Sequence, residues 1–144
     1  MQRDKLISNA FSLHSSGKIK QAADIYNFLI QNKIYDPRVF NNLGSIYSNL
    51  KQFDKAILLF DESIKKFPNS LESYINLASV MVIKGKSDIA KKILKKVIEL
   101  NPKYLKPYSN LAGIFVGEGN FEKAEFFLRK SLEISPKDIN ALVN

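Results

Sequence analysis

The chain has 144 residues, 45% of them hydrophobic, which is enough apolar material for one domain with a buried core. It has no cysteine and one histidine, and this excludes disulfides, thiolate metal sites and cysteine nucleophiles. The sequence contains neither an apolar run long enough to span a bilayer nor a signal-peptide core, so we expect a soluble, cytoplasmic protein with no membrane span.

The net charge of +8 is concentrated in one stretch. Eight lysines lie between Lys84 and Lys106, against only Asp88 and Glu99, so this stretch carries a charge of +6. Such an excess can mark a surface for nucleic acid or an acidic membrane. The abundance of Lys, Asn, Ile, Phe and Tyr favours instead a solvated helix face, whose many lysines reflect a genome with AT-rich codon usage.

The sequence repeats every 34 residues, without insertion or deletion, over residues 3–36, 37–70, 71–104 and 105–138. Two columns of the repeat hold small residues, namely Ala10, Gly44, Ala78, Ala112 and Ala22, Ala56, Ala90, Ala124. Two others hold large apolar residues, namely Leu13, Tyr47, Met81, Phe115 and Tyr26, Phe60, Leu94, Leu128. A period of this length indicates a stack of similar supersecondary units, which we expect to form one domain over residues 1–144.

Each repeat predicts two helices joined by a turn. In the first, third and fourth repeats the turn holds Gly17, Gly85 and Gly119, where a left-handed backbone can end the first helix. Lys51 takes this place in the second repeat, so we expect that turn to be built differently.

The second repeat shows the helical pattern clearly. Apolar residues recur at spacings of three and four in PRVFNNLGSIYSNL and again in DKAILLFDESIKKF. Asp54 is expected at the start of the second helix and Pro68 after its end. Gly44 and Ala56 predict a close helix crossing, because a larger side chain would hold the two helices apart.

The pattern resembles the tetratricopeptide repeat over residues 3–138. The residues that carry the resemblance in the second repeat are Phe40, Leu43, Gly44, Tyr47, Ala56, Phe60 and Pro68, and the third and fourth repeats hold matching residues. The first repeat departs from the pattern, with Asn9 where leucine is expected. The resemblance implies an all-α, right-handed superhelical solenoid of antiparallel helix pairs, in which the first helix of every repeat lines a concave groove.

The groove is expected to hold an asparagine ladder. Asn42, Asn76 and Asn110 recur at the sixth position of their repeats, and a carboxamide matches the C=O and N–H of a peptide bond. The fifth position is also expected to face inward, and it holds Ile7, Asn41, Ile75 and Ser109. The candidate peptide-binding residues are Asn42, Asn76, Asn110, Arg38, Asn41, Ser45, Ser79 and Lys106.

The resemblance therefore implies a non-catalytic scaffold that binds an extended peptide or partner segment, without a small-molecule substrate, cofactor or metal. Some members of the family clamp a C-terminal carboxylate with lysine and asparagine side chains. Here Ile7 and Phe11 occupy the first two clamp positions, so that mode is incomplete.

Two other motifs do not indicate a site. The sequence GEGN over residues 117–120 follows a predicted helix and lacks the lysine of a phosphate loop, so we expect a turn between helices. His14 has no partner at a spacing suited to binding a metal ion.

Two alternatives remain open. The chain could be the acceptor-recruiting arm of a larger enzyme, such as a glycosyltransferase. It could also be an RNA-binding helical-repeat protein, although the predicted inner wall lacks the basic lining that phosphates require.

Residues 139–144, INALVN, repeat the opening of a repeat and are expected to begin a further helix. Six residues are too few for a stable capping helix, which would leave the apolar face around Phe115 and Phe127 partly bare. We therefore expect the chain to be part of a longer protein and to self-associate through its fourth repeat.

Overall fold

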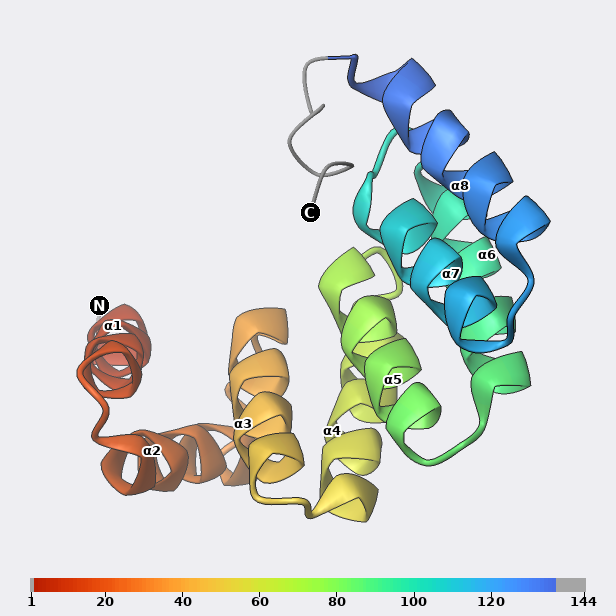
Figure 1. Ribbon diagram of the computed structural model, residues 1–144. Coiled ribbons are helices and arrows are strands. Elements are labelled where there is room, and N and C mark those ends of the chain that lie inside the picture. Colours follow the sequence, from red (N-terminus) through yellow and green to blue (C-terminus); the bar gives the residue numbers. More distant parts are fainter. Residues whose placement is uncertain (1, 137–144) are drawn as a thin grey trace. The chain divides into compact units, whose positions relative to one another are not determined.

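The computed structural model describes residues 2–136, and the expected segment 139–144 lies outside them. The described residues form eight α-helices and no strand (Figure 1). The helices are α1 (Gln2–Ser15), α2 (Ile19–Gln31), α3 (Pro37–Asn49), α4 (Phe53–Lys66), α5 (Leu71–Ile83), α6 (Ser87–Leu100), α7 (Lys106–Gly117) and α8 (Phe121–Ile134). This arrangement confirms the all-α fold class and the prediction of two helices in each repeat.

The chain divides into two compact units, and the boundary between them falls within α5. The N-terminal unit spans Met1–Asn76 and the C-terminal unit spans Leu77–Asn144. The first turns of α5 therefore belong with α1 to α4, and its last turns belong with α6 to α8.

One core cluster of the N-terminal unit is formed by buried apolar residues of α1, α2 and α3. Its buried members are Ile7, Ala10, Ala22, Tyr26, Leu29, Val39, Leu43 and Ile46. Figure 1 shows α3 and α4 side by side, joined by a short turn at one end. In α3 the predicted stripe is thus the buried face at Phe40, Leu43 and Ile46, whereas Leu50, just after the helix, is 59% exposed.

The C-terminal unit is built in the same way. Buried residues of α6 and α7 form its core, and the stacked rings of Phe115 and Phe127, 5.6 Å apart, join α7 to α8. Of the two residues of the face expected to be partly bare, Phe115 is only 4% exposed and is therefore covered, whereas Phe127 is half-buried. The large exposed side chains on α8 are instead Phe121 and Phe126.

The close crossing of α3 and α4 depends on Gly44. A Cβ atom at this position would lie 2.4 Å from Cε1 of the fully buried Phe60 ring. The facing Ala56 is also completely buried. This confirms that Gly44 and Ala56 mark the point where α3 and α4 approach each other.

We predict that Gly44→Ala lowers the free energy of unfolding by about 1–3 kcal/mol, because the Phe60 ring has to leave its place. Gly113 is a matched control on α7, since a Cβ atom there would meet no heavy atom within 4 Å. Gly113→Ala is expected to leave stability unchanged or to raise it by up to about 1 kcal/mol through helix propensity. Denaturant titrations of both variants check this, and equal effects would contradict the close crossing.

The turn of the second repeat has the same geometry as the others, so the expectation of a different turn is wrong. Lys51 adopts a φ of 60°, and Gly17, Gly85 and Gly119 have φ values of 75–81°. The N–H groups of Lys51 and Gln52 donate to the carbonyls of Ser48 and Tyr47 at 2.9 and 2.8 Å. The hydrogen bonds that this geometry closes outweigh the steric cost of a left-handed lysine.

We predict that Lys51→Gly raises the free energy of unfolding by about 0.5–1 kcal/mol, because it relieves the strain of a left-handed side-chain residue. The reverse change Gly85→Lys, in the equivalent turn, is expected to lower stability by about 1 kcal/mol. Chemical denaturation measures both. A loss of stability in Lys51→Gly would show that the lysine side chain contributes more than its backbone costs.

The second helices of the repeats end in two ways. α4 and α6 stop shortly before Pro68 and Pro102, as predicted. In the first repeat Ile34 stands in the proline column, and α2 ends instead through Lys33, whose φ is 58°. The N–H groups of Lys33 and Ile34 donate to carbonyls of α2 at 3.0 and 2.9 Å.

Candidate functional site

In the N-terminal unit, Asn42 of α3 is held by a hydrogen bond to α2, the second helix of the preceding pair. Its half-buried amide donates from Nδ2 to the hydroxyl of Tyr26 at 3.2 Å. The Tyr26 hydroxyl also lies 3.3 Å from Nδ1 of His14. Because the hydroxyl accepts from Asn42, its own hydrogen can be donated to an unprotonated Nδ1 of His14. Burial raises the pKa of Tyr26, and the hydrogen bond from Asn42 opposes this shift.

Asn76 is held in a similar way. Its Nδ2 donates to Oδ1 of Asn41 at 3.4 Å. The fifth position of the repeat, expected to face inward, is buried in three repeats: Ile7, Asn41 and Ile75 are 4–7% exposed, and only Ser109 is exposed. Asn41 thus acts as the acceptor that orients Asn76, a role that sequence reasoning missed.

The predicted site residue Arg38 is part of a helix cap. Asp36 is the N-cap of α3, and its Oδ1 accepts from the backbone N–H of Arg38 at 2.8 Å. The guanidinium of Arg38 donates to both carboxylate oxygens, at 3.0 and 2.7 Å. These hydrogen bonds hold the pKa of Asp36 below its ordinary value. The guanidinium also lies 5.1 Å from the centre of the Phe11 ring.

We predict that Tyr26→Phe lowers the free energy of unfolding by about 0.5–1.5 kcal/mol, because Asn42 and His14 lose their shared partner. Tyr47→Phe is the matched control. Its half-buried hydroxyl accepts only a longer hydrogen bond, 3.4 Å, from Asn27. Thermal and denaturant unfolding of the two variants tests this, and a loss in Tyr47→Phe as large as that in Tyr26→Phe would contradict the proposed role of the network.

The C-terminal unit contains an open groove with a volume of about 590 Å³. It is formed by the last turns of α5 with α6 and α7, and its lining is mainly apolar and small. The lining residues are Ala78, Ser79, Val82, Ile83, Ser87, Leu94, Ser109, Asn110, Gly113, Ile114, Gly117 and Glu118.

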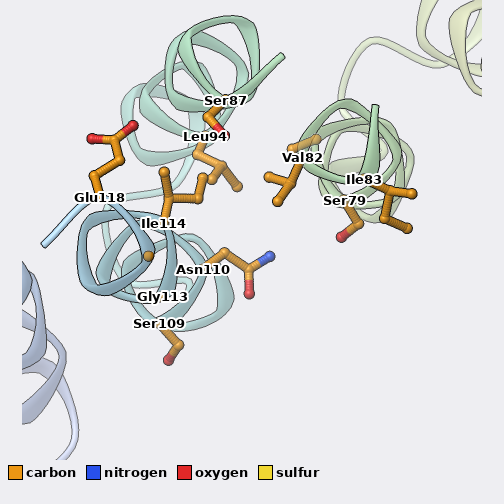
Figure 2. A pocket seen from close by; sticks show the side chains of 12 residues that line it. Ser79, Val82, Ile83, Ser87, Leu94, Ser109, Asn110, Gly113, Ile114 and Glu118 are labelled. Atoms are coloured by element: carbon orange, nitrogen blue, oxygen red, sulfur yellow. The ribbon is translucent and has the colours of Figure 1, made fainter. Parts of the chain in front are cut away.

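Asn110 is the carboxamide of this groove. Figure 2 shows its side chain reaching from α7 into the space towards Val82 and Ser79 of α5. On the side of the groove nearer α6, Ile114 of α7 lies next to Leu94 of α6. An amide donor and acceptor beside apolar surface is the combination that can bind the backbone and the side chain of an extended peptide. Two of the predicted site residues, Ser79 and Asn110, are therefore brought together here.

The rim of the groove carries an ion-pair cluster that the sequence pattern did not reveal. Nζ of Lys91 lies 2.9 and 3.1 Å from the two carboxylate oxygens of Glu118 and 3.1 Å from Oδ1 of Asp88. The pKa of Lys91 is raised, most strongly by its hydrogen bonds with Glu118 and to a lesser extent by its hydrogen bond with Asp88. Only 18% of the Lys91 side chain is exposed, so this lysine differs from the fully solvated face expected for the stretch.

The remaining predicted site residues are placed as follows. Ser45 is half-buried on α3, and Lys106 is exposed at the first residue of α7.

Within the described residues 2–136, no group of three or more His, Cys, Asp or Glu side chains could hold a metal ion. None of the helices in that range has the length and apolar character needed to cross a membrane.

Sequence comparisons relate the chain to a known family and to two curated proteins. Two tetratricopeptide repeat models match it, over residues 37–70 and 81–143. BBSome complex member BBS4 of Bos taurus is 36% identical over 98 residues, which is 68% of this chain and 19% of that protein. BBS4 of Mus musculus is 34% identical over the same length. The chain therefore spans about a fifth of the length of these relatives.

Solved structures show the same fold. MamA has a TM-score of 0.83 at 19% identity, covering 96% of this chain and 81% of that protein. TTC0263, a thermophilic TPR protein of Thermus thermophilus, has a TM-score of 0.77 at 19% identity, covering 93% and 75%. YrrB, described as a TPR protein with an unusual peptide-binding site, has a TM-score of 0.77 at 21% identity, covering 92% and 69%. At these identities the likeness shows the fold alone.

Proposed function

We propose, from the premise that the chain belongs to the tetratricopeptide repeat family, that it binds an extended segment of a partner protein and has no catalytic activity of its own. The observation that carries the proposal is the groove of the C-terminal unit, in which one carboxamide lies among apolar and small side chains. A mainly apolar groove with a few polar groups is typical of binding sites.

Asn110 supplies the specific contact in this proposal. Its amide can donate to a peptide carbonyl and accept from a peptide N–H, so it binds backbone without reading side chains. Apolar side chains of the partner then contact Val82 and Ile114. One or two such hydrogen bonds contribute only about 0.5–1.5 kcal/mol each, so we expect micromolar or weaker affinity.

We propose the same role for Asn42 and Asn76, which recur with Asn110 at intervals of 34 residues. Each uses one N–H within the N-terminal unit, to Tyr26 and to Asn41, and each carboxamide has a second N–H and oxygen lone pairs that can bind a peptide. The internal hydrogen bonds would fix the direction of both amides before a partner arrives, which lowers the entropic cost of binding.

The curated relatives support a role in protein assembly. Both are named as members of a complex, the BBSome complex, and they match over 98 residues of this chain. We propose that this chain likewise holds a partner protein. A cytoplasmic location and self-association through the fourth repeat stay predictions.

The proposal predicts that Asn110→Ala weakens peptide binding about three- to tenfold, which corresponds to about one net hydrogen bond, and leaves the melting temperature unchanged. The probe is a set of fluorescein-labelled peptides selected from a random twelve-residue display library on the wild-type chain. Fluorescence anisotropy measures the dissociation constants. Asn110 is the cleanest ladder position to change, because Asn76→Ala would also remove the hydrogen-bond donor to buried Asn41.

Asn69→Ala is the control, since Asn69 is exposed in the turn between α4 and α5. It is expected to leave every dissociation constant unchanged. Peptides that bind Asn110→Ala as tightly as the wild type would contradict the proposed site. A library that yields no binder below about 1 mM, a free energy of about −4 kcal/mol, would contradict peptide binding itself.

A further inference from the structure

We infer that the groove of the C-terminal unit selects a partner segment in which one bulky apolar side chain stands next to acidic residues. This inference rests on the proposed function and names the chemistry of the segment that the groove accepts. Three observations carry it: an open space above two glycines of α7, the apolar wall of α5 opposite them, and the basic charge next to the groove.

The open space lies above Gly113 and Gly117, which are one helical turn apart on the same face of α7. A Cβ atom built on either glycine meets no heavy atom within 4 Å. This contrasts with Gly44, where the absent side chain is replaced by the Phe60 ring of the same protein. The two glycines of α7 therefore leave a space that the described residues 2–136 do not fill.

The opposite wall is apolar and exposed. Val82 and Ile83 of α5 line the groove while 39% and 60% of their surfaces are exposed, and the buried side chain of Leu94 lies on the side of α6. A bulky side chain placed between this wall and the glycines would remove apolar surface from water on both sides, which favours binding. The volume of about 590 Å³ accommodates a large side chain together with the backbone that bears it.

Charge complementarity selects the neighbouring residues of the partner. Lys84 and Lys86 stand between Ile83 and Ser87, both of which line the groove. Glu118 is the acidic residue of the lining, and its carboxylate is neutralised by Lys91 at 2.9 Å. A segment with aspartate or glutamate beside its apolar residue would therefore be attracted, and a basic segment repelled.

The test uses the peptides selected from the random twelve-residue library on the wild-type chain. We expect leucine, isoleucine, phenylalanine or methionine to be enriched at one position, with aspartate or glutamate at adjacent positions. A labelled peptide of this consensus is then compared with two derivatives, one with the apolar residue changed to serine and one with the acidic residues changed to lysine. Each derivative should bind at least about tenfold more weakly, a difference of about 1.4 kcal/mol.

Variants of the protein test the two halves of the inference separately. Gly113→Leu fills the space and should weaken the consensus peptide at least about tenfold, and Gly113→Ala, which leaves most of the space open, should weaken it less. Lys84→Glu/Lys86→Glu should weaken it by a similar factor and reduce the dependence of binding on salt. Lys92→Glu/Lys96→Glu is the control, because it makes the same change of charge on the exposed face of α6 that points away from Leu94. This variant should change binding less than threefold. Melting temperatures verify that each variant is folded.

The outcomes are distinguishable from those for the proposed function. Peptides that depend on Asn110 but show no apolar position, or that carry lysine and arginine beside it, would overturn this inference and leave peptide binding intact. Equal weakening by both lysine pairs would place the charge effect on the whole unit and overturn the assignment to the groove. Tighter binding of a twelve-nucleotide single-stranded RNA than of the consensus peptide, lost in Lys84→Glu/Lys86→Glu, would replace the peptide by a nucleic acid.

Discussion

The close crossing of the two helices in a pair is the constraint on which the rest of the structure depends. Gly44 has no side chain because the Phe60 ring occupies the space within 2.4 Å of its absent Cβ, and Ala56 is buried at the same crossing. Close contact between the helices of a pair buries one face of each and leaves another face of the first helix for binding. In the C-terminal unit that remaining face of α7 carries Asn110 and Gly113, so the packing constraint also positions the candidate site.

Much of the fold could be predicted because each repeat states the same pattern independently. The 34-residue period, the small columns and the apolar stripes correspond to helix pairs and buried faces in the structure. The turn at Lys51 could not be predicted from residue type, because the propensity of lysine argues against a left-handed backbone. There the two hydrogen bonds that end α3 decide the conformation, and they depend on neighbours that a single position does not show.

The site was less predictable than the fold, since it depends on side-chain partners from other helices. The asparagine column was visible in the sequence, but the acceptors that hold it, Tyr26 and Asn41, come from different columns of the repeat. Similarly, Lys91 belongs to a lysine-rich stretch that indicates a solvated face, yet it is taken up by Glu118 from the turn between α7 and α8. Only the placement of the helices brings these charges together at the rim of the groove.

The central claim is that the groove of the C-terminal unit binds an extended peptide. Chemical-shift perturbation tests it most directly, by titrating the isotope-labelled protein with a peptide selected on the wild-type chain. The account predicts that the largest shifts fall on residues of the groove, above all Ser79, Asn110 and Gly113. Shifts confined to the exposed lysines of α6, or to Phe121 and Phe126 on α8, would place binding elsewhere and contradict the claim.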